Sequence, residues 1–435
     1  MARRSARKGV TEKKQPEATS QEQRAARLAQ TRNLKMARSA HAYVRGSTVK
    51  FYEWLEASAS KVPEGPPVWI CGDCHVGNLG PLADAKGWVT IQIRDLDQTV
   101  IGNPAHDIIR LGLSLASAAR GSNLPGVTTA RILEQLVAGY EKALSDDIEL
   151  GMDKSDRPER IQDLLEHSIR RRWRHLALER LETVKPVLPL GEKFWALTPE
   201  ERTALVQLFE QEPVRAMVTR LQCRESSDAV TLVDAAYWIK GCSSLGRLRY
   251  AVMLRVGEGK GSALCLVDMK ESVAAAAPRA EGVAMPRDNS VRVVTGAKAL
   301  SPNLGDRMIA TRFLDTGVVL RELMPQDLKI EVDRLAHEEA MALATYLAAV
   351  VGWAHGRQMD KATRDTWRSE LAKARTTALD APSWLWSNVV ELISIHEAAY
   401  LDHCRRFPRG SGVKQKGKAL REEQFQLTTA IKSNI

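Results

Sequence analysis

The sequence predicts an α+β protein built from two lobes, and two observations support this prediction. The chain has 435 residues, which exceeds the usual size of a single hydrophobic core. Its pattern also changes along its length, because strand-like runs gather in residues 226–330 while the flanking residues show helical periodicity. We therefore expect a small β lobe at 226–330 and a large helical lobe assembled from residues 41–225 and residues 331–435, which have a basic C-terminal end.

Residues 1–40 precede both lobes and carry most of the net charge of +10. They contain eleven Lys and Arg residues against three Glu residues, and few large apolar side chains. Such a composition predicts a disordered or loosely helical tail. The tail is expected to be a solvated arm, with weak nonspecific contact to nucleic acid as the alternative.

The same composition indicates where the protein works. Six cysteines form no disulfide framework, and no secretory signal is visible, so we expect a cytoplasmic protein. The longest apolar stretch, Met341–Trp353, is too short to span a bilayer and predicts a buried helix.

A polar loop, Asp73-Cys-His-Val-Gly-Asn78, follows a short apolar, strand-like run at 68–70. In phosphoryl transferases, Asp-x-x-x-x-Asn spacing pairs a catalytic base with an amide that binds metal. We assign Asp73 as the base for an attacking hydroxyl and Asn78 as a Mg²⁺ ligand. His75 is also assigned to the site, where it either contacts phosphate or braces the loop.

A second acidic loop follows the strand-like run at 88–93 and contributes Asp95 and Asp97. Asp95 lies 22 residues after Asp73, which leaves room for a hairpin between the two loops. Carboxylates are hard oxygen ligands that suit Mg²⁺. We assign Asp95 as a metal ligand beside Asn78, with Asp97 helping to bind a second ion or ordering the loop.

Within the β lobe, the turn Gly241-Cys-Ser-Ser-Leu-Gly246 precedes a strand-like run at 248–255. It matches the pattern G-x-G-x-x-G, except that serine replaces the middle glycine. Small residues allow backbone N–H groups to approach the phosphates of ATP. We therefore assign four residues of this turn to nucleotide binding, namely Gly241, Ser243, Ser244 and Gly246.

Lys270 ends the next strand-like run, at 263–269, after a glycine-rich hairpin at 257–261. A lysine in this position can reach the phosphates as a positive charge. No acidic partner for it is evident, because the following helical segment, Val291–Lys298, contains no carboxylate. The order of motifs is also reversed relative to a kinase, which predicts circular permutation of a two-lobed fold, with Lys270 facing Asp95.

Three residues outside these loops are also candidates. Asp107 is expected to cap a helix starting at Ile108 and to tie it to the Asp73 loop. Arg110, one helical turn later, could pair with Asp107 or with the Asp73 loop. His355 lies near the end of the apolar helix and could approach the site.

These motifs resemble those of known enzymes. The segment Gly72–Asn78 is similar to the G-D-x-H-x-x-N loop of aminoglycoside phosphotransferase-like and choline-kinase-like enzymes. The permuted order, over roughly residues 35–360, resembles an uncharacterised bacterial family of domain-of-unknown-function proteins, with further similar segments at Arg45-Gly46, Asp95–Leu111, Lys270-Glu271, Arg321–Leu323 and Ala354–Arg357. The resemblance implies a protein-kinase-like, aminoglycoside phosphotransferase-like fold in circularly permuted order.

The leading hypothesis is a Mg²⁺- and ATP-dependent phosphotransferase that acts on an unidentified hydroxyl acceptor. The alternatives are an AMP transferase on the same fold, an inactive nucleotide-binding scaffold, or a nucleic-acid-associated protein. Cys71-Gly-Asp-Cys74-His75 also matches the C-x-x-C-H haem attachment pattern, and its two cysteines could instead form a zinc or redox pair.

Overall fold

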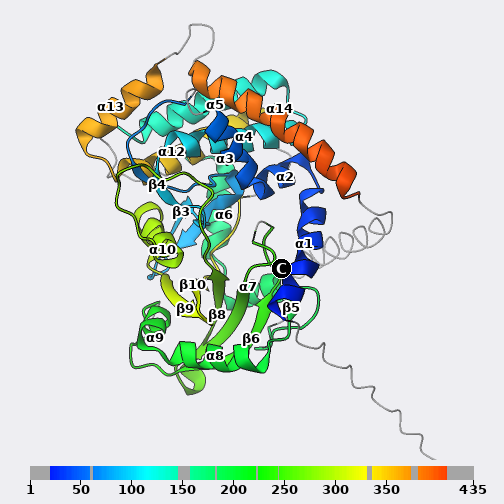
Figure 1. The fold of residues 1–435 in the computed structure, drawn as a ribbon. Coiled ribbons are helices and arrows are strands. Elements are labelled where there is room, and N and C mark those ends of the chain that lie inside the picture. Colours follow the sequence, from blue (N-terminus) through cyan, green and yellow to red (C-terminus); the bar gives the residue numbers. More distant parts are fainter. Residues whose placement is uncertain are drawn as a thin grey trace, which may run out of the picture.

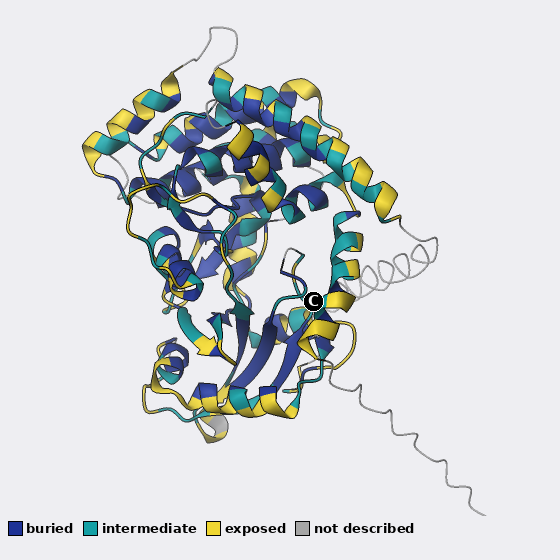
Figure 2. Ribbon diagram, viewed as in Figure 1, coloured by how far each residue is buried: buried dark blue, intermediate teal, exposed yellow. Residues whose placement is uncertain are grey.

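The computed structural model describes residues 20–58, 62–145, 157–181, 184–221, 224–242, 244–330, 336–373 and 381–408. Within these ranges the chain forms a mostly helical body and a body built on one antiparallel sheet (Figure 1). Figure 2 shows buried residues along the strands and inner helices, and exposed residues on the outer faces of the helices. The predicted α+β class is confirmed.

The helical body is assembled from segments on both sides of the sheet in sequence. Its central pair, α5 (Gly126–Lys142) and α12 (His337–Gly356), packs closely because glycines lie at the contact. A Cβ atom on Gly139 would lie 2.1 Å from the Thr345 carbonyl oxygen. The helix predicted around 341–353 is confirmed and buried. The other helices of this body are α2 (Ala40–Gly46), α3 (Thr48–Ala57), α4 (Ala105–Gly121), α6 (Glu159–Ile169), α13 (Lys361–Ala372) and α14 (Ser383–Arg406).

Two small antiparallel sheets hold the predicted polar loops against the helical body. Strand β1 (Val68–Ile70) pairs with β4 (Val100–Gly102), and β2 (Leu79–Ala83) pairs with β3 (Val89–Ile93). The β2–β3 pair is the hairpin expected between the two acidic loops, and the 3₁₀ turn η2 (Val76–Asn78) leads into it.

The second body is built on a six-stranded antiparallel sheet with strand order β5-β6-β7-β8-β10-β9. The predicted strands at 248–255 and 263–269 are confirmed as β7 and β8, joined by a short turn with η4 (Gly259–Gly261). The strands are β5 (Phe194–Trp195), β6 (Val230–Trp238), β7 (Arg249–Val256), β8 (Ala263–Glu271), β9 (Met308–Phe313) and β10 (Thr316–Leu323).

Helices also belong to this body and pack around the sheet. Helix α10 (Asn289–Leu300) packs against β9 and β10 and also contacts β1 and β4 of the helical body. It therefore bridges the two bodies. The remaining helices around the sheet are α7 (Trp173–Leu181), α8 (Pro199–Glu210) and α9 (Glu212–Thr219), whereas α11 (Pro302–Gly305) follows α10 and contacts β2.

The packing places one boundary differently from the sequence prediction. Strand β5 joins the sheet at Trp238, and buried residues of α8 and α9 share its core. The β-rich body therefore begins before residue 226, inside the region assigned to the helical lobe at 41–225. Helical periodicity reveals an apolar face, but it does not reveal which partner that face packs against.

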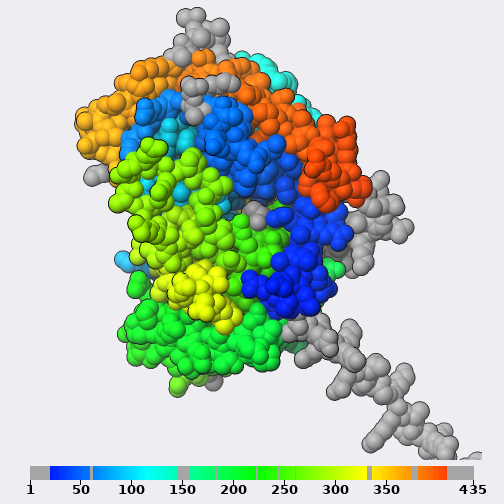
Figure 3. Space-filling view, viewed as in Figure 1, coloured from blue at the N-terminus to red at the C-terminus, as the bar shows by residue number. Residues whose placement is uncertain are grey.

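The N-terminal region differs more strongly from its prediction. Residues 1–19 lie outside the described residues, but α1 (Gln21–Met36) is a helix with a capping box formed by Ser20 and Gln23. Arg24 is fully buried and donates to the Glu201 carboxylate at 2.5 and 2.9 Å. This part of the expected tail is therefore structured, and Figure 3 shows the dark blue α1 against the green β body.

Among the described residues, no helix combines the length and the apolar character that a bilayer-spanning segment needs.

The buried Arg24–Glu201 pair predicts a measurable stability loss. Arg24→Met should destabilise the protein by roughly 3–5 kcal/mol, because it leaves the Glu201 carboxylate buried without its cation. Arg27→Met is the matched control, since Arg27 is an exposed arginine that stacks on Trp195 from the same helix. Denaturant unfolding would measure both variants. Equal, small losses would contradict the structural role of Arg24.

Candidate active site

A cleft of about 430 Å³ lies between the two bodies. Residues from the helical body and from the sheet line it together. It brings together eight of the ten residues that the sequence assigned to the site, which are Asp73, His75, Asn78, Asp95, Asp97, Gly241, Ser244 and Lys270. Gly246 does not line it, and Ser243 lies outside the described residues.

The Asp73 loop is held by Asp107, which is itself buried. The Asp107 carboxylate accepts hydrogen bonds from the backbone N–H groups of Cys71 at 2.7 Å and Gly72 at 2.9 Å. Gly72 has φ +74°, and a Cβ there would lie 2.1 Å from the Gln98 carbonyl oxygen, so the turn requires glycine. His355 also lies within 3.2 Å of Asp107.

The prediction that Asp107 caps a helix is corrected by this geometry. Helix α4 begins at Ala105 with Pro104 as its N-cap, so Asp107 lies inside the first turn. Its carboxylate is directed to the loop backbone rather than to the helix N-terminus. The tying role that the sequence predicted is confirmed.

Asp73 makes two hydrogen bonds within the helical body. One carboxylate oxygen accepts from Arg110 Nε at 2.9 Å, and the other accepts from Thr48 Oγ1 at 2.9 Å. Burial raises the pKa of Asp73, although the charge of Arg110 and both hydrogen bonds oppose this change. A carboxylate that is oriented on both oxygens and has a raised pKa suits a general base.

Asn78 and Asp95 meet at the open end of the β2–β3 hairpin. The Asn78 carbonyl accepts the Arg94 N–H at 2.7 Å, which brings the two loops together. The Asn78 side-chain N–H group donates to the Asp73 carbonyl at 3.0 Å. The side-chain Oδ1 of Asn78 makes no hydrogen bond among the described residues. Asp95 is 49% exposed and Asp97 is 28% exposed at their side chains. These oxygen donors fit a Mg²⁺ ion.

Lys270 reaches from the sheet to both acidic residues of the second loop. Its Nζ lies 3.1 Å from Asp95 Oδ1 and also contacts the Asp97 carboxylate. The expected proximity of Lys270 and Asp95 is therefore confirmed. Burial in the cleft opposes the charged form, but Lys270 and Arg249 together lower the pKa of Asp95 well below its ordinary range.

Lys270 has no carboxylate partner on helix α10. This helix instead presents Arg292, which donates to the carbonyls of Asp97 at 3.2 Å and Val273 at 2.8 Å, and also to that of Thr99. Glu271, the acidic residue next to Lys270, accepts the Leu248 N–H at 2.8 Å, whereas Lys270 pairs with Asp95 and Asp97. Arg292 therefore fixes the backbone on either side of the Lys270 ion pairs.

Two glycines of the turn have a left-handed backbone conformation. Gly241 has φ +88° and Gly246 has φ +98°, a region that disfavours other residues. A Cβ on Gly241 would lie 2.5 Å from Ser244 Oγ. The turn also packs under helix α1, since Lys35 Nζ donates to the Gly241 carbonyl at 3.0 Å and Gly246 lies beside Ala25.

His75 is buried beneath the loop. Burial and the charges of Arg45 and Arg110 lower its pKa well below the ordinary value, so the imidazole is neutral in the fold. Its Nδ1 has no hydrogen-bond partner among the described residues. A neutral, buried ring favours the bracing role over direct charge contact with phosphate.

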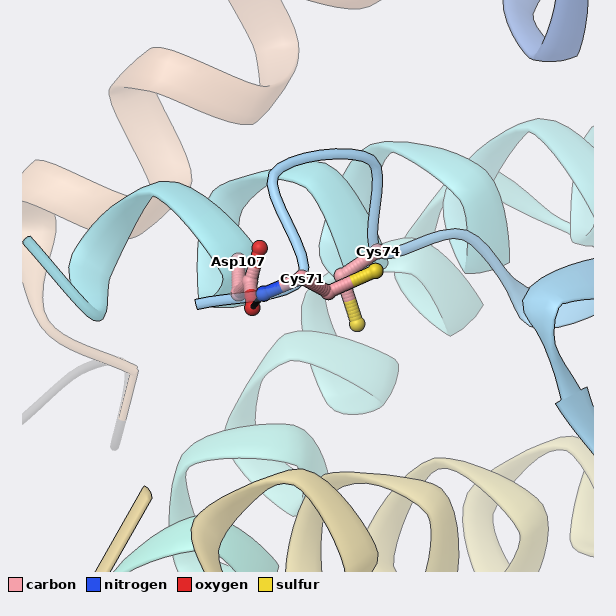
Figure 4. A group of neighbouring side chains, drawn as sticks. All are labelled: Cys71, Cys74 and Asp107. Carbon is pink, nitrogen blue, oxygen red and sulfur yellow. Dashed lines mark hydrogen bonds between the residues drawn. The ribbon is translucent and has the colours of Figure 1, made fainter. Parts of the chain in front are cut away.

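Cys71 and Cys74 lie under the same loop, and Figure 4 shows their sulfur atoms together on the side away from the Asp107 carboxylate. The three side chains offer ligand atoms within 4.8 Å of one another. However, both Asp107 oxygens already accept backbone N–H groups, and both thiols are fully buried. The thiols are therefore closed to haem attachment unless the loop opens.

Sequence reasoning missed Thr48 as a partner of Asp73 and missed most of the basic side chains of the cleft. Thr48 precedes Asp73 by 25 residues and belongs to no motif, so no sequence signal identified it. The cleft also contains Arg94, Arg180 and Lys329, which come from three separate elements.

One comparison with known proteins gives a match. The family model described as an uncharacterized protein conserved in bacteria (DUF2252) matches residues 24–406. No curated protein and no solved structure matches the chain. The match extends on both sides beyond the roughly 35–360 expected from the motifs.

The Lys270 ion pairs predict a change in the titration of Asp95. Lys270→Met should raise the pKa of Asp95, because it removes the nearest positive charge. Since the folded pKa lies below the ordinary 3.8, the pair stabilises the fold above that pH and loses this contribution as the pH falls through the folded pKa. Carboxyl-carbon NMR titration would measure the shift.

Lys240→Met is the control for this titration, because Lys240 pairs with Asp268 at 3.4 Å rather than with Asp95. An unchanged Asp95 pKa in Lys270→Met, or an equal increase in Lys240→Met, would contradict the assigned ion pair.

Proposed function

The chain belongs to the DUF2252 family of proteins conserved in bacteria, and we propose that it is a Mg²⁺- and ATP-dependent phosphotransferase acting on a hydroxyl group. The observation that carries the proposal is the ion pairing of Lys270 with Asp95 and Asp97 across the cleft. It joins a lysine of the sheet to acidic residues that adjoin a candidate base, Asp73. Neither body alone contains the lysine, the two acidic residues and the candidate base.

The order of elements around the sheet supports a kinase-like fold. The glycine turn lies between β6 and β7, Lys270 lies on the following strand, β8, and helix α10 comes next. Protein kinases place their glycine-rich loop, their third-strand lysine and their αC helix in this order.

Circular permutation accounts for the position of the Asp73 loop before the sheet. The helical body contains α4 and α5 from before the sheet and α12 and α14 from after it, and these helices pack together. A fold depends on which elements pack, so the same arrangement can arise from a different chain order.

In this proposal Asp73 receives the proton of the acceptor hydroxyl. Arg110 and Thr48 hold its two oxygens, and the acceptor would share the oxygen that Thr48 now contacts. Asn78, Asp95 and Asp97 would hold Mg²⁺, which neutralises charge on phosphate oxygens when bound. Lys270 would exchange its carboxylate partners for the phosphates, and the glycine turn would present its N–H groups to them.

A nucleotide-binding protein without turnover is the second candidate. It is favoured by the absence of a carboxylate from α10, where Arg292 stands instead. Without such a partner, Lys270 pairs with the candidate metal ligands themselves. Nucleotide binding is common to both candidates, and turnover separates them.

Nucleotide binding should raise the melting temperature in the presence of Mg²⁺. A ligand that binds only the folded state stabilises it by about 2.7 kcal/mol at a hundredfold excess over Kd. Asp95→Asn should remove the Mg²⁺-dependent part of this stabilisation, whereas Asp365→Asn, on the exposed surface of α13, should retain it. Identical Mg²⁺ responses in wild type and Asp95→Asn would argue against this metal site.

Turnover should depend on Asp73. Asp73→Asn keeps the size of the side chain but removes the base, so phosphate transfer or slow ATP hydrolysis should fall by roughly 10²-fold or more. ATP affinity should change little, because other residues hold the nucleotide. Lys270→Ala should instead weaken both binding and turnover. Wild-type protein that binds Mg·ATP but turns over nothing, with Asp73→Asn indistinguishable from it, would identify the second candidate as correct.

A further inference from the structure

A second group of basic side chains lines the cleft apart from Lys270. Arg45 comes from α2, Arg94 follows β3, Arg180 belongs to α7, and Lys329 follows β10. We call these four residues the second cationic cluster. They come from parts of the chain other than the strand and turn that carry Lys270 and the glycines, and they line the same cavity.

The charges of this cluster are poorly compensated. Arg94 is buried, with an exposed fraction of 7%, and its Nε has no hydrogen-bond partner among the described residues. Among the described residues, its side chain makes one hydrogen bond, to the Asp327 carbonyl at 3.4 Å. The Asp327 carboxylate is already paired with Arg307. A buried guanidinium with an unsatisfied donor is costly unless a ligand supplies the acceptor.

The other members are less buried, since Arg45 and Arg180 are half-buried and Lys329 is exposed, but their charges also have few acidic partners. No hydrogen bond or ion pair joins Arg45 or Lys329 to another residue in the described part of the chain, and the ion partner of Arg180 is its neighbour Glu179, at 3.0 Å. Partial burial together with Arg45, Arg94 and Arg180 lowers the pKa of Lys329 to about 8. Like charges held this close to one another favour a bound anion.

We propose that the second cationic cluster is an anion subsite that binds a phosphoryl group. Guanidinium groups match the oxygens of phosphate in paired hydrogen bonds, and a lysine amine adds a point charge. The subsite lies in the cavity that also contains Asp73 and Asp95, so a phosphoryl group bound there would lie in the same cleft as the candidate base.

Two sources could supply this phosphoryl group, and naming them rests on the proposed function. One is the terminal phosphates of the nucleotide itself, bound so that they point toward the cluster rather than toward Lys270. The other is a phosphate already present on the acceptor. The first would suit AMP transfer, and the second would make the acceptor a phosphorylated molecule.

Pyrophosphate binding to the full chain in Mg²⁺-free buffer tests the subsite by titration calorimetry. Lys329→Gln and Arg45→Gln should each weaken binding by about tenfold or more, the scale of a lost charge-assisted hydrogen bond. Lys86→Gln removes the same charge from an exposed turn outside the cleft and should bind as wild type does.

Two results would overturn the subsite. These are absence of pyrophosphate binding, or equal affinity in Lys329→Gln, Arg45→Gln and wild type. Because the assay needs neither Mg²⁺ nor turnover, a cluster-dependent affinity would stand even if Mg·ATP failed to bind. Conversely, Mg·ATP turnover with no pyrophosphate binding would retain the proposed function and reject the subsite.

A competition arm distinguishes the two sources. Pyrophosphate is titrated into protein saturated with a non-hydrolysable ATP analogue and Mg²⁺. Loss of the cluster-dependent binding would assign the subsite to the phosphates of the nucleotide. Retained binding that still requires Lys329 would assign it to a phosphorylated acceptor. Either result supports the subsite.

Discussion

Lys270 extends from the sheet to Asp95 and Asp97 of the helical body, and the candidate site depends on this contact. The lysine neutralises two neighbouring carboxylates that would otherwise repel each other. Arg292 of α10 binds the backbone carbonyls beside them, so the bridging helix and the ion pairs act on the same loop. Mg²⁺ and phosphate would supply matching charges of both signs, so a bound nucleotide could replace these ion pairs without leaving a carboxylate or an amine unpaired.

The other half of the site depends on buried residues that never reach the cleft. Asp107 fixes the Cys71–Gly72 backbone, and His355 and Tyr140 continue this chain of contacts into the α5–α12 core. The Asp73 loop is therefore joined to the most tightly packed part of the helical body. Such support holds a catalytic side chain in one orientation, because its neighbours have no room to rearrange.

Local features were predictable from the sequence, but most long-range partners were not. The β7–β8 hairpin and the β2–β3 hairpin that joins Asn78 to Asp95 follow from short periodic runs and their turns. The order of motifs predicted that Lys270 faces Asp95, 175 residues away, but no motif predicted that Arg24 pairs with Glu201, 177 residues away. The composition of the residues around Arg24 fits a solvated charged tail as well as it fits a helix with a buried face. The second cationic cluster combines single residues from four separate parts of the chain, and no linear motif contains them all.

Anomalous diffraction from crystals containing Mn²⁺ and a non-hydrolysable ATP analogue tests the central claim most directly. The account predicts a metal peak within ligand distance of the Asp95 carboxylate and Asn78 Oδ1, with Lys270 Nζ moved from the carboxylates to a phosphate oxygen. A metal peak elsewhere, or a nucleotide bound outside the cleft while Lys270 remains paired with Asp95 and Asp97, would contradict it.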